Sequence, residues 1–217
     1  QSCKRPCFHD EYLPTFNRPN VHLVDTEGQG VDEITETGVV VNGVEYPIDL
    51  LVFASGFEVT SEYHHRLGFD PKGKGGVPLS EAWADGPGTL HGVLGRGFPN
   101  MLMISATQGG QAINFVHTIT ETAIHITHII ERALNENIVA MEPTVEAQDA
   151  WFNVLIGTVW GTARYNAMCT PGYLNNEGGV GTIRSGKSSS YMTSALEFVD
   201  ILEKWRAAGD FPGYEVT

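Results

Sequence analysis

The chain has 217 residues, and its 13 basic and 26 acidic side chains give a formal net charge of −13. This acidic balance argues against a nucleic-acid backbone or an anionic membrane as the main partner. No apolar run approaches the roughly 18 residues of a membrane span, and three cysteines are too few for a disulfide framework, so we expect a globular, cytoplasmic protein with reduced thiols.

The first residues include two cysteines and two adjacent basic side chains. The chain opens with Gln1 rather than Met, and Cys3-Lys4-Arg5-Pro6-Cys7 follows at once. Natural termini usually fray, so we expect this sequence to be the C-terminal part of a longer protein whose N-terminal half is missing. Lys4 and Arg5 are suited to hold a phosphate or another anion, although from the dipeptide alone an exposed surface pair is the simpler interpretation.

Three β patterns follow. A β-branched run at 21–25 comes after turn residues and predicts a short strand. Asn42-Gly43 between the apolar runs at 39–41 and 44–46 predicts a hairpin with a two-residue turn. The nearly continuous apolar run at 48–54 is typical of a strand buried on both faces of a parallel sheet, and it ends at a glycine-containing turn.

Residues 68–100 are rich in glycine and proline, which predicts loops and short elements. A second buried strand is expected at 101–105.

Helical patterns dominate the rest of the chain. Apolar residues recur every three or four positions from Ile113 to Leu134, which predicts a long helix. Further helices are expected at about 145–160 and 188–205, with a polar, glycine-rich loop at 170–187 between them. Strands followed by long helices indicate an α/β fold.

Two matches to phosphate-binding motifs lack the context that they require. Residues 181–188 fit the P-loop pattern, but a polar, glycine-rich stretch precedes them instead of a strand, so an NTPase is disfavoured. Gly95-Arg96-Gly97 begins like a dinucleotide fingerprint that Pro99 and Asn100 do not complete. If the chain binds a dinucleotide, the loop that holds the pyrophosphate lies elsewhere.

The histidines and cysteines do not form a metal-binding pattern. His125 and His128 are three residues apart on the expected long helix, but no nearby carboxylate or cysteine completes a set. Cys3 and Cys7 have a C-x-x-x-C spacing without a second pair, and Cys169 lacks a local histidine partner. We therefore predict no metal site and interpret the three cysteines as buried or incidental thiols.

Several motifs, in the same order, closely resemble the C-terminal half of flavin-dependent Baeyer–Villiger monooxygenases. They are Cys3-Lys4-Arg5-Pro6, Phe16-Asn17-Arg18-Pro19-Asn20-Val21, Asp49 to Phe57, Trp83, Gly86-Pro87, Gly92, Gly97-Phe98-Pro99-Asn100 and the stretch from Ala106 to Phe115. The resemblance implies the C-terminal portion, with long helices, of a flavoprotein that has Rossmann-like FAD and NADP domains. Residues 1–54 would end the NADP domain, and 55–217 would form the C-terminal part of the FAD domain with its helices.

The resemblance also implies roles for single residues. The arginine of the family's Lys-Arg pair stabilises the negatively charged C4a-peroxyflavin, which makes Arg5 the catalytic residue. The preceding lysine contacts the 2′-phosphate of NADPH, which makes Lys4 the selector of NADP. Ser55 and Gly56 fall in the turn that joins the two domains, where Ser55 replaces a threonine and keeps its hydroxyl. The glycine-rich fingerprints belong to the family's N-terminal half, so this chain by itself is not expected to complete either dinucleotide site.

The same resemblance places the turn Gln108-Gly109-Gly110 against the isoalloxazine of FAD, with the start of the following helix aimed at the pyrimidine end. Gln111, Ile113 and Phe115 would line the ketone pocket. In several relatives the loop that corresponds to 165–180 folds over the nicotinamide and carries a tryptophan. No tryptophan occurs here, so contacts from this loop to the substrate are left open.

The function implied is that of an FAD- and NADPH-dependent Baeyer–Villiger monooxygenase, which inserts one atom of O₂ into a ketone to give an ester or lactone. The fragment by itself is expected to be inactive. One alternative is a related class B flavin monooxygenase that oxidises nitrogen or sulfur. Another is a non-catalytic acidic binding module of the same fold, which would release no flavin on denaturation.

Overall fold

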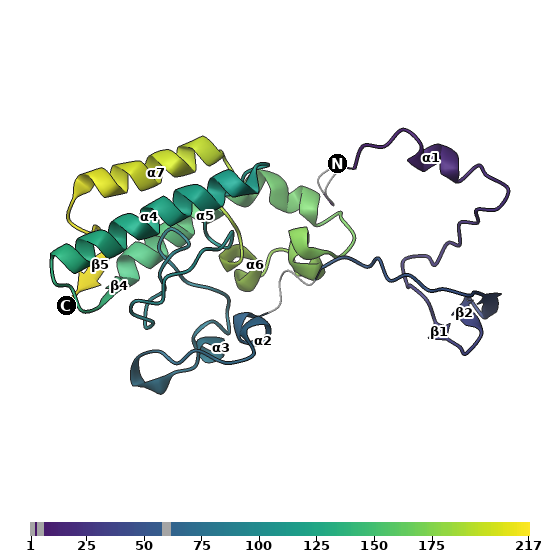
Figure 1. Ribbon diagram of the computed structural model, residues 1–217, viewed down its shortest axis with the longest axis horizontal. Helices are drawn as coiled ribbons and strands as arrows, with labels where there is room; N and C mark the ends of the chain where they lie inside the picture. The colour runs from purple at the N-terminus through teal and green to yellow at the C-terminus, as the bar shows by residue number, and fades with distance from the viewer. Residues whose placement is uncertain (1–2, 4–6, 58–61) are drawn as a thin grey trace. The chain divides into compact units, whose positions relative to one another are not determined.

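The computed structural model of the chain describes Cys3, residues 7–57 and residues 62–217 (Figure 1). These residues form two compact units, one of residues 7–57 and the other of residues 62–217 together with Cys3. The expected division between the NADP and FAD parts, at residues 54 and 55, lies close to the boundary of the units. Assignment of the units to those two domains stays a prediction.

The first unit contains one short helix and a three-stranded antiparallel sheet in the order β1-β2-β3. Its elements are α1 (Tyr12–Thr15), β1 (Glu33–Ile34), β2 (Gly38–Val41) and β3 (Val44–Pro47).

The predicted hairpin is confirmed as β2 and β3. Val41 lies opposite Val44, and Asn42 and Gly43 between them take φ angles of 52° and 74°. Two successive positive φ angles match the twist of the flanking strands, and asparagine and glycine adopt them at little cost.

The other two strand predictions for this unit are wrong. Residues 21–25 and 48–54 are not paired as strands, and Leu50, Val52 and Phe53 are 79%, 72% and 76% exposed. A strand exists through the ladder of hydrogen bonds to a neighbour, and the described residues supply no such neighbour to these runs. An apolar run indicates that a segment suits a buried sheet, but it does not supply the adjacent strand.

The second unit is mainly helical, and its three long helices confirm the periodicity predictions. Its elements are α2 (Tyr63–Leu67), η1 (Lys74–Gly76), α3 (Leu79–Ala82), α4 (Phe115–Asn135), β4 (Met141–Pro143), α5 (Val145–Asn166), η2 (Tyr173–Gly178), α6 (Ile183–Lys187), α7 (Ala195–Ala208) and β5 (Tyr214–Val216).

Two helix boundaries and one strand in this unit differ from the sequence predictions. Helix α5 runs past Gly161 to Asn166, because one glycine inside a helix costs only about 1 kcal/mol. Helix α7 begins at Ala195, where the Ser194 side chain accepts hydrogen bonds from two first-turn N–H groups. The strand expected at 101–105 is wrong, since this half-buried segment has no strand partner among the described residues.

Helices α4, α5 and α7 lie side by side, with the antiparallel pair β4–β5 at one end (Figure 1). Their core is completed by loop residues before α4. Its members are Leu90, Val93, Leu94, Ile129, Met141, Trp151, Leu155, Tyr191, Phe198, Leu202, Trp205, Phe211 and Tyr214. In the described part of the chain, no helix has the length and apolar character needed to cross a membrane.

Candidate functional site

The segment that enters α4 is a tight turn held by its own hydrogen bonds. The Ser105 hydroxyl accepts a 3.0 Å bond from the Thr107 N–H and lies 2.8 Å from the Tyr63 hydroxyl. The Gly109 N–H donates to the Ala106 carbonyl at 3.2 Å. The backbone between Ser105 and Gly110 is therefore fixed before the helix begins.

Two glycines let this turn pack directly on the rest of the unit. A Cβ on Gly110 would lie 2.3 Å from the Phe198 ring of α7, and a Cβ on Gly109 would lie 2.7 Å from the Ser105 carbonyl oxygen. Both glycines are buried. Space, rather than a special φ angle, requires glycine at these positions.

Gly110→Ala should therefore destabilise the protein by about 1–3 kcal/mol, because the added methyl overpacks the contact with α7. Gly157→Ala is the matched control, since a Cβ at that exposed position of α5 meets nothing within 4 Å. We expect the control to stabilise by about 0.5–1 kcal/mol through the better helix propensity of alanine. Urea unfolding of both variants measures the difference, and equal effects would contradict the packing argument.

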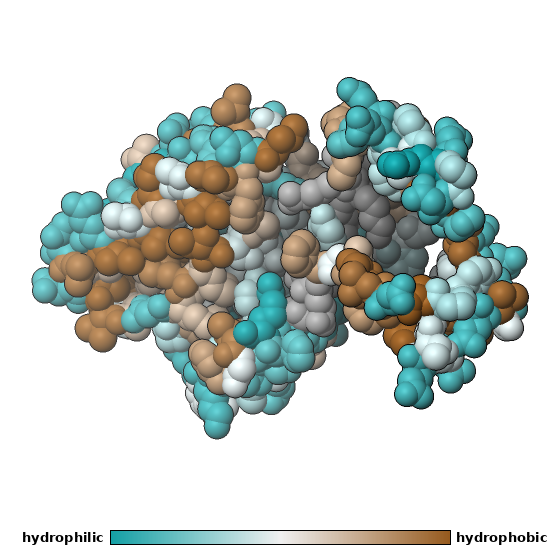
Figure 2. All heavy atoms as spheres, turned by 45° about the vertical axis from the view of Figure 1, so that its right-hand side comes forward, coloured by the Kyte–Doolittle hydropathy of each residue, from teal (hydrophilic) through white to brown (hydrophobic). Residues whose placement is uncertain are grey.

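The start of α4 gathers the residues predicted for the ketone pocket. Asn114 caps the helix by accepting a 3.4 Å hydrogen bond from the His117 N–H. Gln111 is exposed, Ile113 is fully exposed and Phe115 is 48% exposed. The positive end of the dipole of this 21-residue helix lies at the same segment and favours a neighbouring negative charge. Figure 2 shows that apolar side chains are exposed on this helical unit.

Gln108 is buried, unlike the exposed residues Gln111, Ile113 and Phe115 that follow it. It is only 1% exposed, and its side-chain amide makes hydrogen bonds inside the unit. Any contact with a flavin would therefore come through the segment that Gln108 shapes, not through its own amide. The assignment of the Gln108–Gly110 turn to the flavin stays a prediction.

The remaining predicted site residues lie in the first unit or outside the described residues. Ser55 and Gly56 are exposed, and Gly56 has a φ angle of 97°, a conformation that residues with a Cβ rarely adopt. Lys4 and Arg5 lie outside the described residues.

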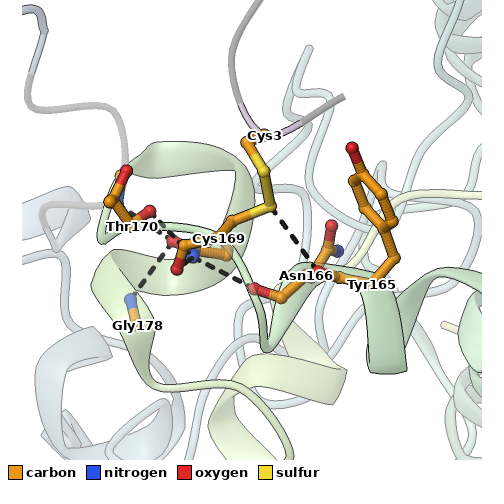
Figure 3. The surroundings of a disulfide bond; sticks show 8 residues. Cys3, Tyr165, Asn166, Cys169, Thr170 and Gly178 are labelled. Carbon is orange, nitrogen blue, oxygen red and sulfur yellow. Dashed lines mark hydrogen bonds between the residues drawn. A yellow bond between two sulfur atoms is a disulfide. The ribbon is translucent and has the colours of Figure 1, made fainter. Parts of the chain in front are cut away.

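A disulfide joins Cys3 to Cys169, with 5.3 Å between their Cα atoms (Figure 3). This corrects the prediction that both residues are thiols. The two cysteines are separated by 166 residues, so no local spacing signals the pair, and an odd number of cysteines does not reveal which two are bonded. The bond connects the residue directly before Lys4-Arg5 to the end of the α5 region.

The loop after α5 is organised around one buried asparagine. Asn175 is 6% exposed, and both ends of its amide bond to the loop backbone. Its Nδ2 donates to the carbonyls of Asn166, Cys169 and Thr170, and its Oδ1 accepts from the N–H groups of Gly172 and Gly178. Such an amide substitutes for secondary structure, so this polar segment is ordered in spite of its composition.

Non-reducing peptide mapping of the complete protein should recover the Cys3 and Cys169 peptides as one linked species, and reduction should expose two additional thiols. Cys169→Ser should lower the unfolding free energy by about 2–4 kcal/mol, because the bond closes a long loop and restricts the unfolded chain. Cys7→Ser is the control and should retain the link. Separate peptides from unreduced wild-type protein would contradict the pairing.

Two known proteins are similar to this chain over nearly its whole length. Pentalenolactone D synthase from Streptomyces arenae is 45% identical over 216 residues, which are 99% of this chain and 36% of that protein. A Baeyer–Villiger monooxygenase from Streptomyces coelicolor is 42% identical over 207 residues, which are 94% of this chain and 34% of that protein. The chain thus spans about a third of the length of these relatives. No protein-family model matches it.

Solved structures give the same result. The polycyclic ketone monooxygenase from Thermothelomyces thermophila matches with a TM-score of 0.82 and 36% identity, over 99% of this chain and 35% of that one. Cyclohexanone monooxygenase from Rhodococcus sp. Phi1 bound to NADP⁺ matches with a TM-score of 0.80 and 26% identity, over 99% of this chain and 39% of that one. The chain corresponds to the C-terminal part of the flavoprotein Baeyer–Villiger monooxygenases. The family resemblance and the fold class inferred from the motifs are confirmed.

In the second unit, two buried histidines form an aromatic cluster that sequence reasoning missed. His91 and His125 are 7% and 0% exposed, with ring centroids 5.7 Å apart. His91 lies edge-on to Trp151 at 5.0 Å, and His125 lies edge-on to Trp205 at 4.8 Å. Burial lowers the pKa of His91 to about 4 and that of His125 to about 3. Among the described residues, no group of three or more histidines, cysteines or carboxylates is arranged to hold a metal ion.

The P-loop match does not form a P-loop in the structure. Residues Ile183–Lys187 are themselves helix α6, whose N-terminus is capped by Thr182. Lys187 is the last residue of α6, and α7 begins only at Ala195. A P-loop requires a glycine-rich loop before the helix that its Lys-Ser pair opens.

Two open hollows of about 450 Å³ each are lined by residues outside the predicted site. One, in the first unit, is lined by His22, Leu23, Val24, Asp25, Val41, Asn42, Val44 and Tyr46. The other, in the second unit, is lined by Pro71, Lys72, Gly73, Lys74, Phe98, Pro99 and Met101. Neither contains a residue that the sequence assigned to cofactor or substrate, so cavity size alone does not locate the site.

Proposed function

We propose that this chain is the C-terminal part of an FAD- and NADPH-dependent Baeyer–Villiger monooxygenase that acts on a ketone. The observation that carries the proposal is the match of 99% of the chain, at 36% identity and a TM-score of 0.82, to a polycyclic ketone monooxygenase. The solved cyclohexanone monooxygenase with bound NADP⁺ supports the nicotinamide cofactor. A curated relative with 43% identity is named an FAD-binding monooxygenase, which supports the flavin.

The residues of the second unit fit a flavin beside the start of α4. An exposed segment with a polar Gln111 follows a turn that is rigid and buried on its inner side, and the positive end of a long helix dipole lies at the same place. Gly109 and Gly110 would support the flavin-binding backbone from behind. FAD, when bound, supplies the electron transfer and oxygen activation that no amino-acid side chain provides.

The other assigned residues would bind and orient the reactants. The Arg5 guanidinium would provide a positive charge where negative charge develops during oxygen transfer. Lys4 would bind the 2′-phosphate of NADPH through a charge-assisted hydrogen bond. Ile113 and Phe115 would offer an apolar wall that excludes water and holds the ketone, and Gln111 offers an amide to orient its carbonyl. Ser55 and Gly56 would join the two dinucleotide domains.

The overall reaction consumes one ketone, one O₂, one NADPH and one proton, and gives one ester or lactone, one water and one NADP⁺. The glycine-rich phosphate-binding loops are not in this sequence, so we propose that the N-terminal part of the same enzyme supplies them.

The test is a side-by-side assay of the complete protein with a ketone, an amine and a sulfide, in the presence of NADPH and isotopically heavy O₂. We expect one ester for each NADPH consumed, with one heavy oxygen atom in the ester. Oxidation of the amine or sulfide without any ester would favour a related monooxygenase of nitrogen or sulfur. A native protein that releases no flavin on denaturation would be a binding module.

A further inference from the structure

Gln108 is a buried polar residue in a strained conformation. Its side chain is 1% exposed and its φ angle is 57°, in the left-handed region that residues with a Cβ rarely occupy. Such a conformation persists only where surrounding contacts determine it, and it is found preferentially at functional sites.

The amide of Gln108 satisfies all four of its hydrogen-bonding positions. Its Oε1 accepts from both the N–H and the hydroxyl of Thr89, each at 2.7 Å. Its Nε2 donates to the carbonyls of Pro87 at 2.7 Å and Lys187 at 2.9 Å. An amide offers two donors and two acceptor lone pairs, so none is left for a ligand.

The backbone of Gln108 also makes hydrogen bonds to other segments of the unit. Its N–H donates to the Ser189 carbonyl at 2.8 Å, and its carbonyl accepts from the indole N–H of Trp151 at 2.9 Å. One residue thus bonds the loop at 87–89, the segment at 187–189 and helix α5.

The neighbours of Gln108 attach the turn to the same segment. The Ser190 hydroxyl donates to the Ala106 carbonyl at 2.6 Å, and the Tyr191 N–H donates to the Gly109 carbonyl at 2.8 Å. Two residues after Gly109, Gln111 becomes exposed and the chain enters α4. The inner side of the turn is therefore clamped, while its outer side leads to the segment that the proposed function places at the flavin and the ketone.

We propose that Gln108 is a positioning residue of the monooxygenase site. It sets the place of the Gln111–Phe115 segment relative to the rest of the unit, and it does so without touching cofactor or substrate. The proposal rests on the proposed function. It goes beyond that function because it assigns control of the reaction to a residue whose side chain is wholly internal. It also couples the start of α4 to the end of α6 and the residues that follow it.

The reaction offers a readout that a loss of stability alone would not change. Productive turnover gives one ester for each NADPH, whereas unproductive turnover combines NADPH, a proton and O₂ into NADP⁺ and hydrogen peroxide. A small displacement of a positioning group lowers the productive step strongly, since reacting atoms must lie in a narrow geometry. A misplaced α4 start should therefore divert NADPH to peroxide.

Three variants of the complete enzyme test the proposal. Gln108→Met keeps the length of the side chain and removes its hydrogen bonds. Gln108→Asn tolerates the left-handed backbone and keeps an amide that is one methylene too short to reach its partners. Thr89→Val removes a single hydroxyl and is the mildest change. Leu202→Ala is the matched control, because it opens the same core at a fully buried position of α7 outside the proposed site.

We expect the Gln108 variants to raise the fraction of NADPH that ends as peroxide by about tenfold, with Thr89→Val smaller in the same direction. Leu202→Ala should lower the melting temperature and keep the wild-type peroxide fraction. A wild-type peroxide fraction in Thr89→Val and in each Gln108 variant that folds would overturn the proposal, because Gln108 would then be a core residue only. If the wild-type enzyme makes no oxygenated product, the proposed function fails, and this outcome is seen before any variant is measured.

Discussion

On the proposed function, the Arg5→Ala variant of the complete protein should be reduced by NADPH at nearly the wild-type rate and should lose ester formation by about a thousandfold. We expect the two half-reactions to separate because the role proposed for Arg5 is to stabilise the negative charge of the oxygen-transfer step. A fixed cation in a water-excluded site stabilises that charge without reorganisation, and alanine offers no replacement. Anaerobic stopped-flow reduction measures the first step, and quantification of ester under O₂ measures the second.

Two further variants make the result specific. Arg5→Lys should recover part of the activity, because lysine keeps the charge but lacks the planar set of donors that orients a guanidinium. Arg66→Ala removes a cation from an exposed position of α2 and should leave both half-reactions unchanged. Normal ester formation by Arg5→Ala would remove Arg5 from the catalytic machinery.

The parts of the fold that sequence reasoning predicted are those stabilised by near neighbours in the chain. Spacings of three and four residues specify α4, because the apolar face of a helix is built from one continuous segment. The hairpin β2–β3 follows from Asn42-Gly43 for the same reason. The run at 48–54 failed because a strand needs a partner, and its own residues do not indicate whether the described chain contains one.

In the candidate site, too, local features were predicted and contacts between residues distant in the sequence were not. The resemblance assigned the turn at 108–110 and the residues before and at the start of α4 to the site, because these lie in one short motif, and that assignment stays a prediction. The side-chain contacts of Gln108 could not be predicted from the sequence, because Thr89 and Lys187 are 19 and 79 residues away along the chain. The Cys3–Cys169 bond spans 166 residues and was missed for that reason. Asn175 carried a weak signal, an asparagine in a glycine-rich loop, which is typical of an amide that bonds the nearby backbone.

The protein should lose stability on mild acidification because of His91 and His125. Both rings lie in the core of the second unit, and in the described part of the chain the Nδ1 of His91 and both ring nitrogens of His125 have no hydrogen-bond partner. Burial is the main cause of their low pKa values, and the charges of His91, Arg206 and His128 lower the pKa of His125 further.

The direction of the pH effect on stability follows from the histidine pKa values in the folded and unfolded states. A histidine in the unfolded chain has a pKa near 6.5, whereas the folded values are about 4 and about 3, so between these limits the unfolded state binds more protons. The stabilisation is fully present above about pH 6.5 and is lost as the pH falls toward the folded values. Each histidine contributes a slope of up to about 1.4 kcal/mol per pH unit, so the pair should cost about 4 kcal/mol between pH 7 and pH 5.

Hydrogen exchange of the α4 and α7 amides measures this loss in the unit that contains the pair, after correction for the intrinsic pH dependence of exchange. His125→Phe keeps an aromatic ring against Trp205 and removes one titrating group, so the pH slope should fall to about half. His65→Gln is the matched control, because it removes an exposed histidine of α2 that lies outside the buried cluster. A slope that stays the same in His125→Phe would mean that the acid sensitivity arises elsewhere in the protein, and that the buried rings accept protons without opening the core.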